Sequence, residues 1–543
     1  MAGAYGNLGH GRADYSNADI YREMQRSGFQ QGSNVVSQMS PTSQVDYSAY
    51  SRGAAVDVYG WQQQQQQQKA TGVSMAEAST QFAASNPQQY STGMCSAAAA
   101  AATAPPAVRT IPIRKQYVPI VKNGSTVAYK TAYFGNVYVG SPEPQAFSVV
   151  FDTGSGHLIL PSSGCESETC TKHRRYKRGS SSSAVDIEYD GRLITDLSKP
   201  RDQLRISFGT GEVSGEFVQD RICLTQSATD CSSVRVVLAT AMTPDPFGLF
   251  DFDGVLGLGT TALTLNDHFS FFGQMVKQNP TMHPRFAVYL ADSDEGQSAI
   301  SFGGHEEPCA ASEVRWAPVA MPELGYWQVQ IKSVRMGGKV LDECEDGGCR
   351  AILDTGTSLV GVPRAVSRAM HRRLARPVPE ALAAAGADVD CRTVAGSALE
   401  FDLGSVVVTL GQEDYSRPKP YNMTVPGQAS AWRLWCRSLL LPVDMKEPLG
   451  PRVFIWGEPV LRKYYTIYDW DAKQVGFSVA GESPTISGDG QSGSPAIGAP
   501  PAGSLAAGAP LSGGGGTGGA GGGGGLRGSA AAATTSSPGS SAA

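Results

Sequence analysis

VFDTGS at Val150–Ser155 and ILDTGT at Ile352–Thr357 are near-copies of one six-residue pattern. Each places Asp-Thr-Gly directly after two apolar residues, so that Asp152 and Asp354 occupy equivalent positions. A single Asp-Thr-Gly is uninformative, but two copies with matching flanks indicate a duplicated unit that brings two carboxylates together. Paired carboxylates can supply one acid and one base from the same type of side chain.

A second pair of landmarks supports the duplication. Val255-Leu256-Gly257 follows the first aspartate, and Ile455-Trp456-Gly457 follows the second at nearly the same distance. One recurring feature could be coincidence, whereas two that recur at matched spacing indicate homologous lobes. The period is too long for a solenoid repeat.

The 543-residue chain differs in composition between its ends and its middle. Residues 1–105 are rich in Gln, Ser, Ala and Gly, and residues 481–543 are mostly Gly, Ala, Ser, Pro and Thr. Neither end has enough large apolar side chains to offset the entropy of ordering, so we expect a disordered head and tail. Between them we expect a short pro-strand or linker at 106–130, an N-terminal lobe at 131–315 and a C-terminal lobe at 316–480.

The middle of the chain is typical of β-structure. Runs rich in β-branched and aromatic residues at Tyr133–Gly140, Phe147–Phe151, Leu204–Phe208 and Trp327–Ile331 predict strands separated by Gly and Pro turns. Helical periodicity is scarce, and the clearest candidate is Arg364–Arg373, just after the second Asp-Thr-Gly. The pattern predicts an all-β fold class.

Charge excludes some partners. The formal net charge is −5, and no basic stripe interleaved with aromatic residues indicates nucleic-acid binding. No apolar run is long enough to span a bilayer. The basic run Lys172–Arg178 is interpreted as a solvated loop, with an anionic partner or a processing site as the alternative.

Further motifs make the chain similar to the pepsin-like aspartic proteases, which include cathepsin D and the plasmepsins. The resemblance extends from about Tyr133 to Val479 and includes Phe252–Leu258, Gly325–Gln328 and Gly457–Tyr465, with Phe269–Met275 more similar to protozoan members. It implies a bilobal fold of two pseudo-symmetric β-rich lobes with the active-site cleft between them. It also implies a monomer that cleaves proteins or peptides and needs no metal or other cofactor.

The resemblance assigns roles around the two aspartates. Asp152 and Asp354 would form the catalytic dyad, in which one ionised carboxylate activates water while its protonated partner polarises the scissile carbonyl. The neighbouring residues would support the two catalytic loops: Thr153 and Thr355 by locking them together, Gly154 and Gly356 by permitting tight turns, and Ser155 and Thr357 by bonding the outer carboxylate oxygens.

The resemblance also places a flap and substrate pockets. The flap tip would be Phe208, Gly209, Thr210 and Gly211, and the pocket walls would be Ile159, Phe252, Val255, Tyr326 and Ile455. Family members usually carry Tyr at the position of Phe208 and Trp at that of Ile159, and these two side chains hydrogen-bond. Because loss of both polar partners together can be nearly neutral, we interpret the change as a consistent apolar variant of the flap; the alternative is a core Phe in a strand. The apolar walls favour bulky hydrophobic residues around the cut.

The ten cysteines indicate an oxidising compartment. Three pairs resemble the disulfides of the family: Cys165–Cys170, Cys344–Cys349 and Cys391–Cys436. Cys223 and Cys231 could close an extra hairpin, and Cys95 and Cys309 are left over. A metal site is not expected, because no His lies at ligand spacing from these pairs. Sequons at Asn123 and Asn422 agree with a secretory, lysosome-like, vacuolar or extracellular destination, although the N-terminus shows no apolar signal segment.

Two functional hypotheses remain. The leading one is an active aspartic endopeptidase. The family is usually made as an inactive precursor, so Ile111–Ile120 could be a short pro-strand whose basic side chain neutralises the dyad; it is shorter than the usual inhibitory segment, and both a zymogen and a mature enzyme stay open. The alternative is a catalytically silent peptide- or protein-binding protein on the same fold. Such relatives usually lose an Asp or the adjacent Gly, and here both aspartates and both glycines are present.

Overall fold

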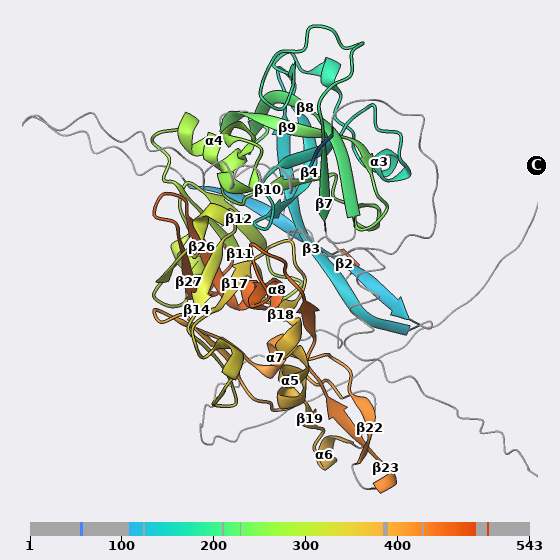
Figure 1. The fold of residues 1–543 in the computed structure, drawn as a ribbon, viewed down its shortest axis with the longest axis vertical. Coiled ribbons are helices and arrows are strands. Elements are labelled where there is room, and N and C mark those ends of the chain that lie inside the picture. Colours follow the sequence, from blue (N-terminus) through green and yellow to red (C-terminus); the bar gives the residue numbers. More distant parts are fainter. Residues whose placement is uncertain are drawn as a thin grey trace, which may run out of the picture. The chain divides into compact units, whose positions relative to one another are not determined.

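The computed structural model describes residues 108–122, 125–208, 211–227, 230–383, 389–425, 428–484 and 497–498, together with the backbone of 55–57. Strands dominate these residues and helices are few and short, which confirms the predicted all-β class (Figure 1). The predicted disordered head and most of the tail lie outside the described residues.

The first aspartate ends a strand inside a four-strand arrangement. β4 (Gln145–Asp152) pairs in parallel with β10 (Gly254–Gly257), β10 pairs antiparallel with β5 (Leu158–Pro161), and β5 pairs in parallel with β9 (Cys231–Met242). β4, β5 and β10 are largely buried, as their continuous apolar sequences predict.

The second aspartate follows a strand in the same arrangement. β17 (Cys349–Leu353) pairs in parallel with β25 (Val453–Trp456), β25 pairs antiparallel with β18 (Val360–Pro363), and β18 pairs in parallel with β24 (Leu440–Val443). The order and the directions of pairing repeat those of the first half. The duplication seen in the sequence is therefore a duplication of topology.

The glycine of each landmark lies against the aspartate loop of its own half. A Cβ on Gly257 would come within 2.5 Å of the backbone of Gly156 and His157, and a Cβ on Gly457 would lie 2.1 Å from the carbonyl oxygen of Thr357. Any side chain there would push the aspartate loop away, so glycine is required for close approach of the backbones.

Strands from distant parts of the chain form one continuous set between the two halves. The order is β2 (Arg109–Lys122), β12 (Ser298–Phe302), β11 (Arg285–Tyr289), β26 (Tyr464–Asp469), β27 (Gln474–Val479) and β13 (Arg315–Pro318), and every neighbouring pair is antiparallel. β3 (Ser125–Val139) joins this set to β4.

The remaining elements complete each half. In the first half they are β1 (Ala55–Asp57), β6 (Val185–Ile187), β7 (Gln203–Phe208), β8 (Gly211–Cys223), α3 (Glu168–Lys172) and α4 (Phe271–Gln278). In the second half they are β14 (Gln328–Ile331), β15 (Ser333–Met336), β16 (Lys339–Val340), β19 (Arg376–Pro377), β20 (Leu399–Asp402), β21 (Val407–Leu410), β22 (Tyr421–Val425), β23 (Gln428–Cys436), α5 (Arg364–Leu374), α6 (Glu380–Ala383), α7 (Gln412–Tyr415) and α8 (Glu458–Lys463). The helix predicted at 364–373 is α5, and its position is confirmed.

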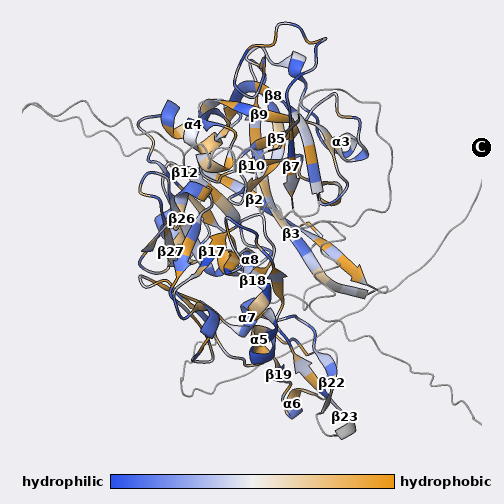
Figure 2. Ribbon diagram, viewed as in Figure 1, coloured by the Kyte–Doolittle hydropathy of each residue, from blue (hydrophilic) through white to orange (hydrophobic). Residues whose placement is uncertain are grey.

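β2 is part of the folded sheet. Its first residues pair with β12 and its later residues with β3, and Ile111, Ile113 and Ile120 are buried. The outer half of β2 carries the colours of hydrophobic residues in Figure 2. Ile497 adds a parallel bridge to this strand, through backbone hydrogen bonds of 2.8 Å to Lys115 and to Tyr117.

The basic run Lys172–Arg178 is packed in part. Tyr176 in its middle is 1% exposed, and its hydroxyl donates to Asp220 at 2.6 Å. The Arg175 guanidinium donates to the carbonyl oxygen of Cys165 at 3.1 Å, and Arg178 pairs with Asp186 at 2.9 Å. The interpretation of this run as a solvated loop holds for the exposed Lys172, Arg174 and Lys177, whereas Tyr176, Arg175 and Arg178 anchor the run to its neighbours.

Candidate active site

The two aspartate loops hold their carboxylates in the same way. The backbone N–H of Gly154 donates to Asp152 Oδ1 at 2.9 Å, and the backbone N–H of Gly356 donates to Asp354 Oδ1 at 2.8 Å. In each case the donor lies two residues after the carboxylate, which is the geometry of an Asx turn. The Asp-Thr-Gly motif thus orients one oxygen of each carboxylate by its own backbone.

The two loops are joined across the pseudo-symmetry by their threonines. Thr153 Oγ1 donates to the carbonyl oxygen of Leu353 at 2.8 Å, and Thr355 Oγ1 donates to that of Phe151 at 2.6 Å. Each hydroxyl also accepts from the other threonine's backbone N–H, at 3.0 and 3.1 Å. Residues from the two halves are thereby held together by four buried hydrogen bonds.

The outer oxygens of the two carboxylates differ. Thr357 Oγ1 donates to Asp354 Oδ2 at 2.7 Å. Its counterpart Ser155 acts on Asp152 more weakly: the Ser155 hydroxyl lowers the pKa of Asp152, but within the described residues it does not reach the geometry of a hydrogen bond to Asp152 Oδ2. The two loops are therefore asymmetric at the outer carboxylate oxygens.

The two carboxyl groups are coupled electrostatically. Asp152 is fully buried and Asp354 is 1% exposed. Burial raises the pKa of Asp152. Burial and the negative charge of Asp152 together raise the pKa of Asp354 well above its ordinary value. Because like charges in a buried site are costly, the pair retains a proton at a pH where isolated aspartates have lost theirs.

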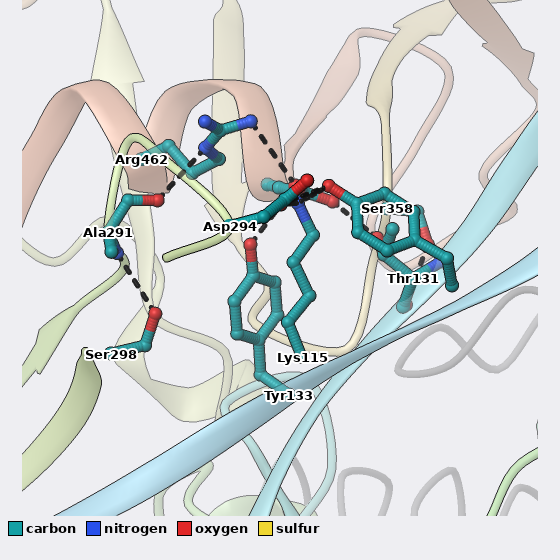
Figure 3. A network of polar contacts seen from close by, with 10 residues as sticks. Lys115, Thr131, Tyr133, Ala291, Asp294, Ser298, Ser358 and Arg462 are labelled. Atoms are coloured by element: carbon teal, nitrogen blue, oxygen red, sulfur yellow. Dashed lines mark hydrogen bonds and ion pairs between the residues drawn. The ribbon is translucent and has the colours of Figure 1, made fainter. Parts of the chain in front are cut away.

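A buried polar network joins β2 and β3 to the start of α8, and Figure 3 shows its side chains around Lys115, Thr131 and Tyr133. Glu458, the first residue of α8, donates its backbone N–H to the carbonyl oxygen of Thr357 at 2.9 Å. Its carboxylate binds Lys115 Nζ at 2.6 Å and accepts from the hydroxyls of Tyr133, at 3.0 Å, and Thr131. The network therefore connects β2 and β3 to the loop that carries Asp354.

A second contact extends this support. Ser358, just after the catalytic loop, accepts from the backbone N–H of Thr131 and donates to its carbonyl oxygen, each at 2.9 Å. Sequence reasoning missed Ser358, Thr131 and Glu458, because their partners lie more than 200 residues away. The one signal available was a lone Glu after Gly457 in an otherwise apolar segment.

The pro-strand hypothesis expected a basic side chain of Ile111–Ile120 at the dyad. Lys115 is the buried cation of this segment, and it binds Glu458, Asp294 at 3.6 Å and the Tyr117 hydroxyl instead. The main causes of the pKa shifts of Asp152 and Asp354 are burial, nearby hydrogen bonds and the other aspartate. The charge of Lys115 is neutralised by Glu458.

The flap is partly described. β7 and β8 form the hairpin, with Phe208 opposite Gly211, while Gly209 and Thr210 lie outside the described residues. Phe208 is 2% exposed and meets Phe247 edge-to-face at 5.4 Å. Phe208 and Ile159 belong to one apolar cluster, a placement that agrees equally with an apolar flap and with a core Phe in a strand.

The predicted pocket residues divide between the two halves. Ile159, Phe252 and Val255 lie in the same apolar cluster as Phe208. Tyr326 and Ile455 lie in a second cluster with residues of the C-terminal half. All five are at least 90% buried, and the second cluster also contains Ile120, Ala128 and Leu263 from the N-terminal half.

The structure contains the four disulfides expected from the sequence. They are Cys165–Cys170, Cys223–Cys231, Cys344–Cys349 and Cys391–Cys436. Cys309 is a buried free thiol, and Cys95 lies outside the described residues. Within the described ranges, no group of three or more His, Cys, Asp or Glu could hold a metal ion, and no helix is long and apolar enough to cross a membrane.

Comparison with known proteins agrees with this geometry. A family model of the eukaryotic aspartyl proteases matches residues 132–480, so the chain belongs to this family, the pepsin-like aspartic proteases, and it is an aspartic-type endopeptidase with their bilobal all-β fold. Among its relatives are cathepsin E of Aquarana catesbeiana (31% identity over 354 residues, 64% of this chain and 79% of the relative) and gastricsin of Homo sapiens (31% over 360 residues, 64% and 81%). Vacuolar protease A of Neurospora crassa is 32% identical over 362 residues, 64% of this chain and 78% of the relative.

Proposed function

We propose that Asp152 and Asp354 are the catalytic pair of this endopeptidase. The observation that carries the proposal is the coupling of two buried carboxyl groups, each held by its own loop, in which the charge of one raises the pKa of the other. Such a pair contains a base and an acid at the same pH.

The reaction follows from this protonation state. The ionised carboxylate accepts a proton from a water molecule as the water oxygen attacks the scissile carbonyl carbon. The protonated carboxyl donates a hydrogen bond to the carbonyl oxygen, which carries the developing negative charge. The amide nitrogen then receives a proton from the pair, the C–N bond breaks, and the dyad again holds one proton.

We further propose that the enzyme prefers bulky hydrophobic residues on both sides of the cut. Two apolar clusters support this preference, one with Ile159, Phe252 and Val255 and the other with Tyr326 and Ile455. Phe208 extends the first cluster without a polar group, so the flap side would offer a substrate apolar contact rather than a hydroxyl.

The test is cleavage of a peptide library by the purified protein and its Asp152→Asn and Asp354→Asn variants across acidic to neutral pH. Each variant should lower kcat/KM by about 10²–10⁴-fold, the range for loss of an acid–base group. Asp346→Asn, at an exposed surface ion pair, is the matched control and should cleave like the wild type. Cleavage retained by Asp354→Asn would overturn the dyad, and a profile without hydrophobic preference would overturn the specificity.

The working environment is proposed from the cysteines. Four disulfides and the exposed Asn422 of a sequon favour a secretory or vacuolar destination, where thiols oxidise. We expect a monomer, because one chain supplies both aspartates.

A further inference from the structure

A buried histidine lies at the end of the loop that begins with Asp152. His157 is 4% exposed, and its ring meets the Phe269 ring edge-to-face, with 5.5 Å between the ring centres. Its Nε2 accepts the backbone N–H of Leu265 at 3.1 Å. A ring nitrogen can accept only when it carries no proton, so the ring is neutral and its proton lies on Nδ1. The structure thus uses His157 as a hydrogen-bond acceptor.

This acceptor is one of the contacts that fix the first aspartate loop. The backbone N–H of Leu258 donates to the carbonyl oxygen of Asp152 at 2.7 Å, and that of Gly257 donates to the carbonyl oxygen of His157 at 3.0 Å. These bonds hold both ends of the loop against the end of β10. The His157 ring adds a bond to Leu265, farther along the chain. The position of Asp152 therefore depends on how the other end of its loop is held.

The second aspartate loop has a different side chain at this position. Leu359 follows Asp354 at the same spacing at which His157 follows Asp152. It is 7% exposed and lies in the apolar cluster of the C-terminal half. An apolar side chain fills this position but accepts no hydrogen bond. The two loops thus need a buried side chain here, and the histidine gives the Asp152 loop a polar contact in addition.

Charged groups stand near His157 without bonding to it. On the elements that pack around the ring, the titratable residues are Asp152 of its own loop, Asp267 and His268 of the 3-10 helix η4 (Asp267–Phe269), and Arg235 of β9, whose guanidinium lies 5.9 Å from the centre of the Phe269 ring. Among the described residues, none of these side chains hydrogen-bonds to the His157 ring. Burial lowers the pKa of His157 to about 4.

Protonation would reverse the role of the ring. A protonated Nε2 is a donor, and it would then face the backbone N–H of Leu265, which is also a donor. The bond would be lost and a positive charge would be buried without a bonded partner, which is costly. Acid therefore removes one of the contacts that hold the Asp152 loop.

We propose that His157 is a positioning residue for Asp152: its neutral ring holds the aspartate loop in the active geometry, and protonation of the ring in acid releases the loop and lowers kcat. The inference rests on the proposed catalytic role of Asp152. His157 itself takes no part in proton transfer to the substrate, because its ring nitrogen is occupied by the Leu265 N–H.

The test compares kcat at pH 4.5 and pH 3.0 for the full-length wild type and His157→Gln, with circular dichroism at each pH to show that the protein is folded. A glutamine amide oxygen can accept the Leu265 N–H and does not titrate. The readout is the ratio of the two kcat values, because titration of the aspartates is common to both proteins. With a pKa of about 4, about ten His157 rings are protonated for each neutral one at pH 3.0. The wild-type ratio should therefore be about 5–10-fold larger than that of His157→Gln.

Two further variants complete the design. His157→Leu introduces the residue type of the second loop and removes the acceptor at every pH. It should lower kcat at pH 4.5 by about tenfold, whereas His157→Gln should stay within about threefold of the wild type. His268→Gln is the matched control, because it removes an exposed histidine of η4, and it should keep the wild-type ratio.

Each outcome decides the proposal. Equal ratios in the wild type and His157→Gln overturn it, as does a His157→Leu protein with the kcat of the wild type. A purely structural histidine would lower the Tm as the pH falls from about 6.5 to 4, where the unfolded chain binds a proton that the folded protein does not, and would leave the kcat ratio unchanged. If His157→Leu does not fold, the comparison with His157→Gln decides.

Asp152→Asn, measured beside these variants, separates the two proposals. Cleavage retained by Asp152→Asn overturns the catalytic role of Asp152. An inactive Asp152→Asn together with equal kcat ratios in the wild type and His157→Gln overturns only the role of His157.

Discussion

At the scale of single residues, Asp152 and Asp354 are alike in backbone and different in environment. Thr357 donates a hydrogen bond to the outer oxygen of Asp354, whereas the Ser155 hydroxyl lowers the pKa of Asp152 without reaching hydrogen-bond geometry at Oδ2 among the described residues. The pKa of Asp354 is raised by burial and by the charge of Asp152. The pair is thus tuned by its surroundings, because the residue type is the same on both sides.

This tuning predicts a pH-dependent stability effect for Asp354→Asn. Because the pKa of Asp354 is raised in the folded state, ionising this group lowers the free energy of unfolding. The loss is absent below a pH of about 4, where the unfolded chain is also protonated, and it grows as the pH rises toward the raised pKa. Removing the ionisable group should raise the Tm at pH 7 by a few degrees, which corresponds to about 1 kcal/mol in the free energy of unfolding. The Tm at pH 3 should change little. Melting curves by circular dichroism measure this. Equal destabilisation at both pH values would contradict it.

Phe208 predicts a second effect at the residue scale. Phe208 is 2% exposed and its ring lies in an apolar cluster, so the hydroxyl introduced by Phe208→Tyr would be buried among apolar side chains. We expect a loss of about 1–3 kcal/mol in urea unfolding. Phe208→Leu stays apolar and loses mainly the edge-to-face contact with Phe247, so it should cost less. A tyrosine variant as stable as the wild type would show that the hydroxyl finds an acceptor.

At the scale of elements, β2 supports the catalytic region from behind. Lys115 on β2 and Glu458 at the start of α8 form an ion pair in which neither side chain is more than 11% exposed. Burial alone would raise the pKa of Glu458, but the charges of Lys115 and Arg462 lower it below its usual value. The carboxylate therefore stays ionised in mildly acidic solution, and its stabilisation is lost only as the pH falls through this lowered pKa.

The prediction at this scale is that Lys115→Met destabilises the protein by about 3–5 kcal/mol in urea unfolding, because Glu458 is left buried without its closest cation. Lys115→Met combined with Glu458→Gln should recover part of the loss. Lys172→Met, at the exposed pair with Glu168, is the control and should leave the unfolding midpoint nearly unchanged. A Lys115→Met protein as stable as the Lys172→Met protein would contradict the role of the network.

At the scale of the whole molecule, Thr153 and Thr355 join the two halves at the aspartate loops. Their four hydrogen bonds connect residues about 200 positions apart, so they exist only when both halves are folded. The strand set from β2 to β13 joins the same halves elsewhere. The relative position of the two carboxylates thus depends on contacts between halves.

Thr355→Val should lower kcat more than its loss of stability alone would explain. It removes the donor to Phe151 and the acceptor for Thr153, so we expect a loss of about 1–3 kcal/mol and a fall in kcat of about 10–100-fold from misplaced carboxylates. Thr264→Val is the matched control, because this buried hydroxyl bonds the carbonyl oxygens of Thr261 and Asn266 nearby in the chain. It should lose stability without a comparable loss of kcat. Equal kcat values in the two variants would contradict the prediction.

Much of this protein could be predicted from its sequence because the information is local. Asp-Thr-Gly contains the carboxylate, the hydroxyl that bonds the other loop and the N–H donor of the turn in three consecutive residues. Gly257 and Gly457 are needed because the backbone of each lies against the aspartate loop of its own half. Short strands and a single clear helix follow from the periodicity of the residues within each element. Three cysteine pairs were predicted by the resemblance to the family, and the fourth, Cys223–Cys231, by the short hairpin that it could close.

Only the tertiary structure decided the features that depend on distant partners. The Lys115–Glu458 pair, the Ser358–Thr131 contacts and the packed basic run around Tyr176 join residues that no local pattern connects. The same holds for the different environments of Asp152 and Asp354, where burial and the charge of Asp152 raise the pKa of Asp354. The reason is physical: a motif determines which groups a loop presents, whereas burial and neighbouring charge, which determine what those groups do, arise only when remote segments pack together.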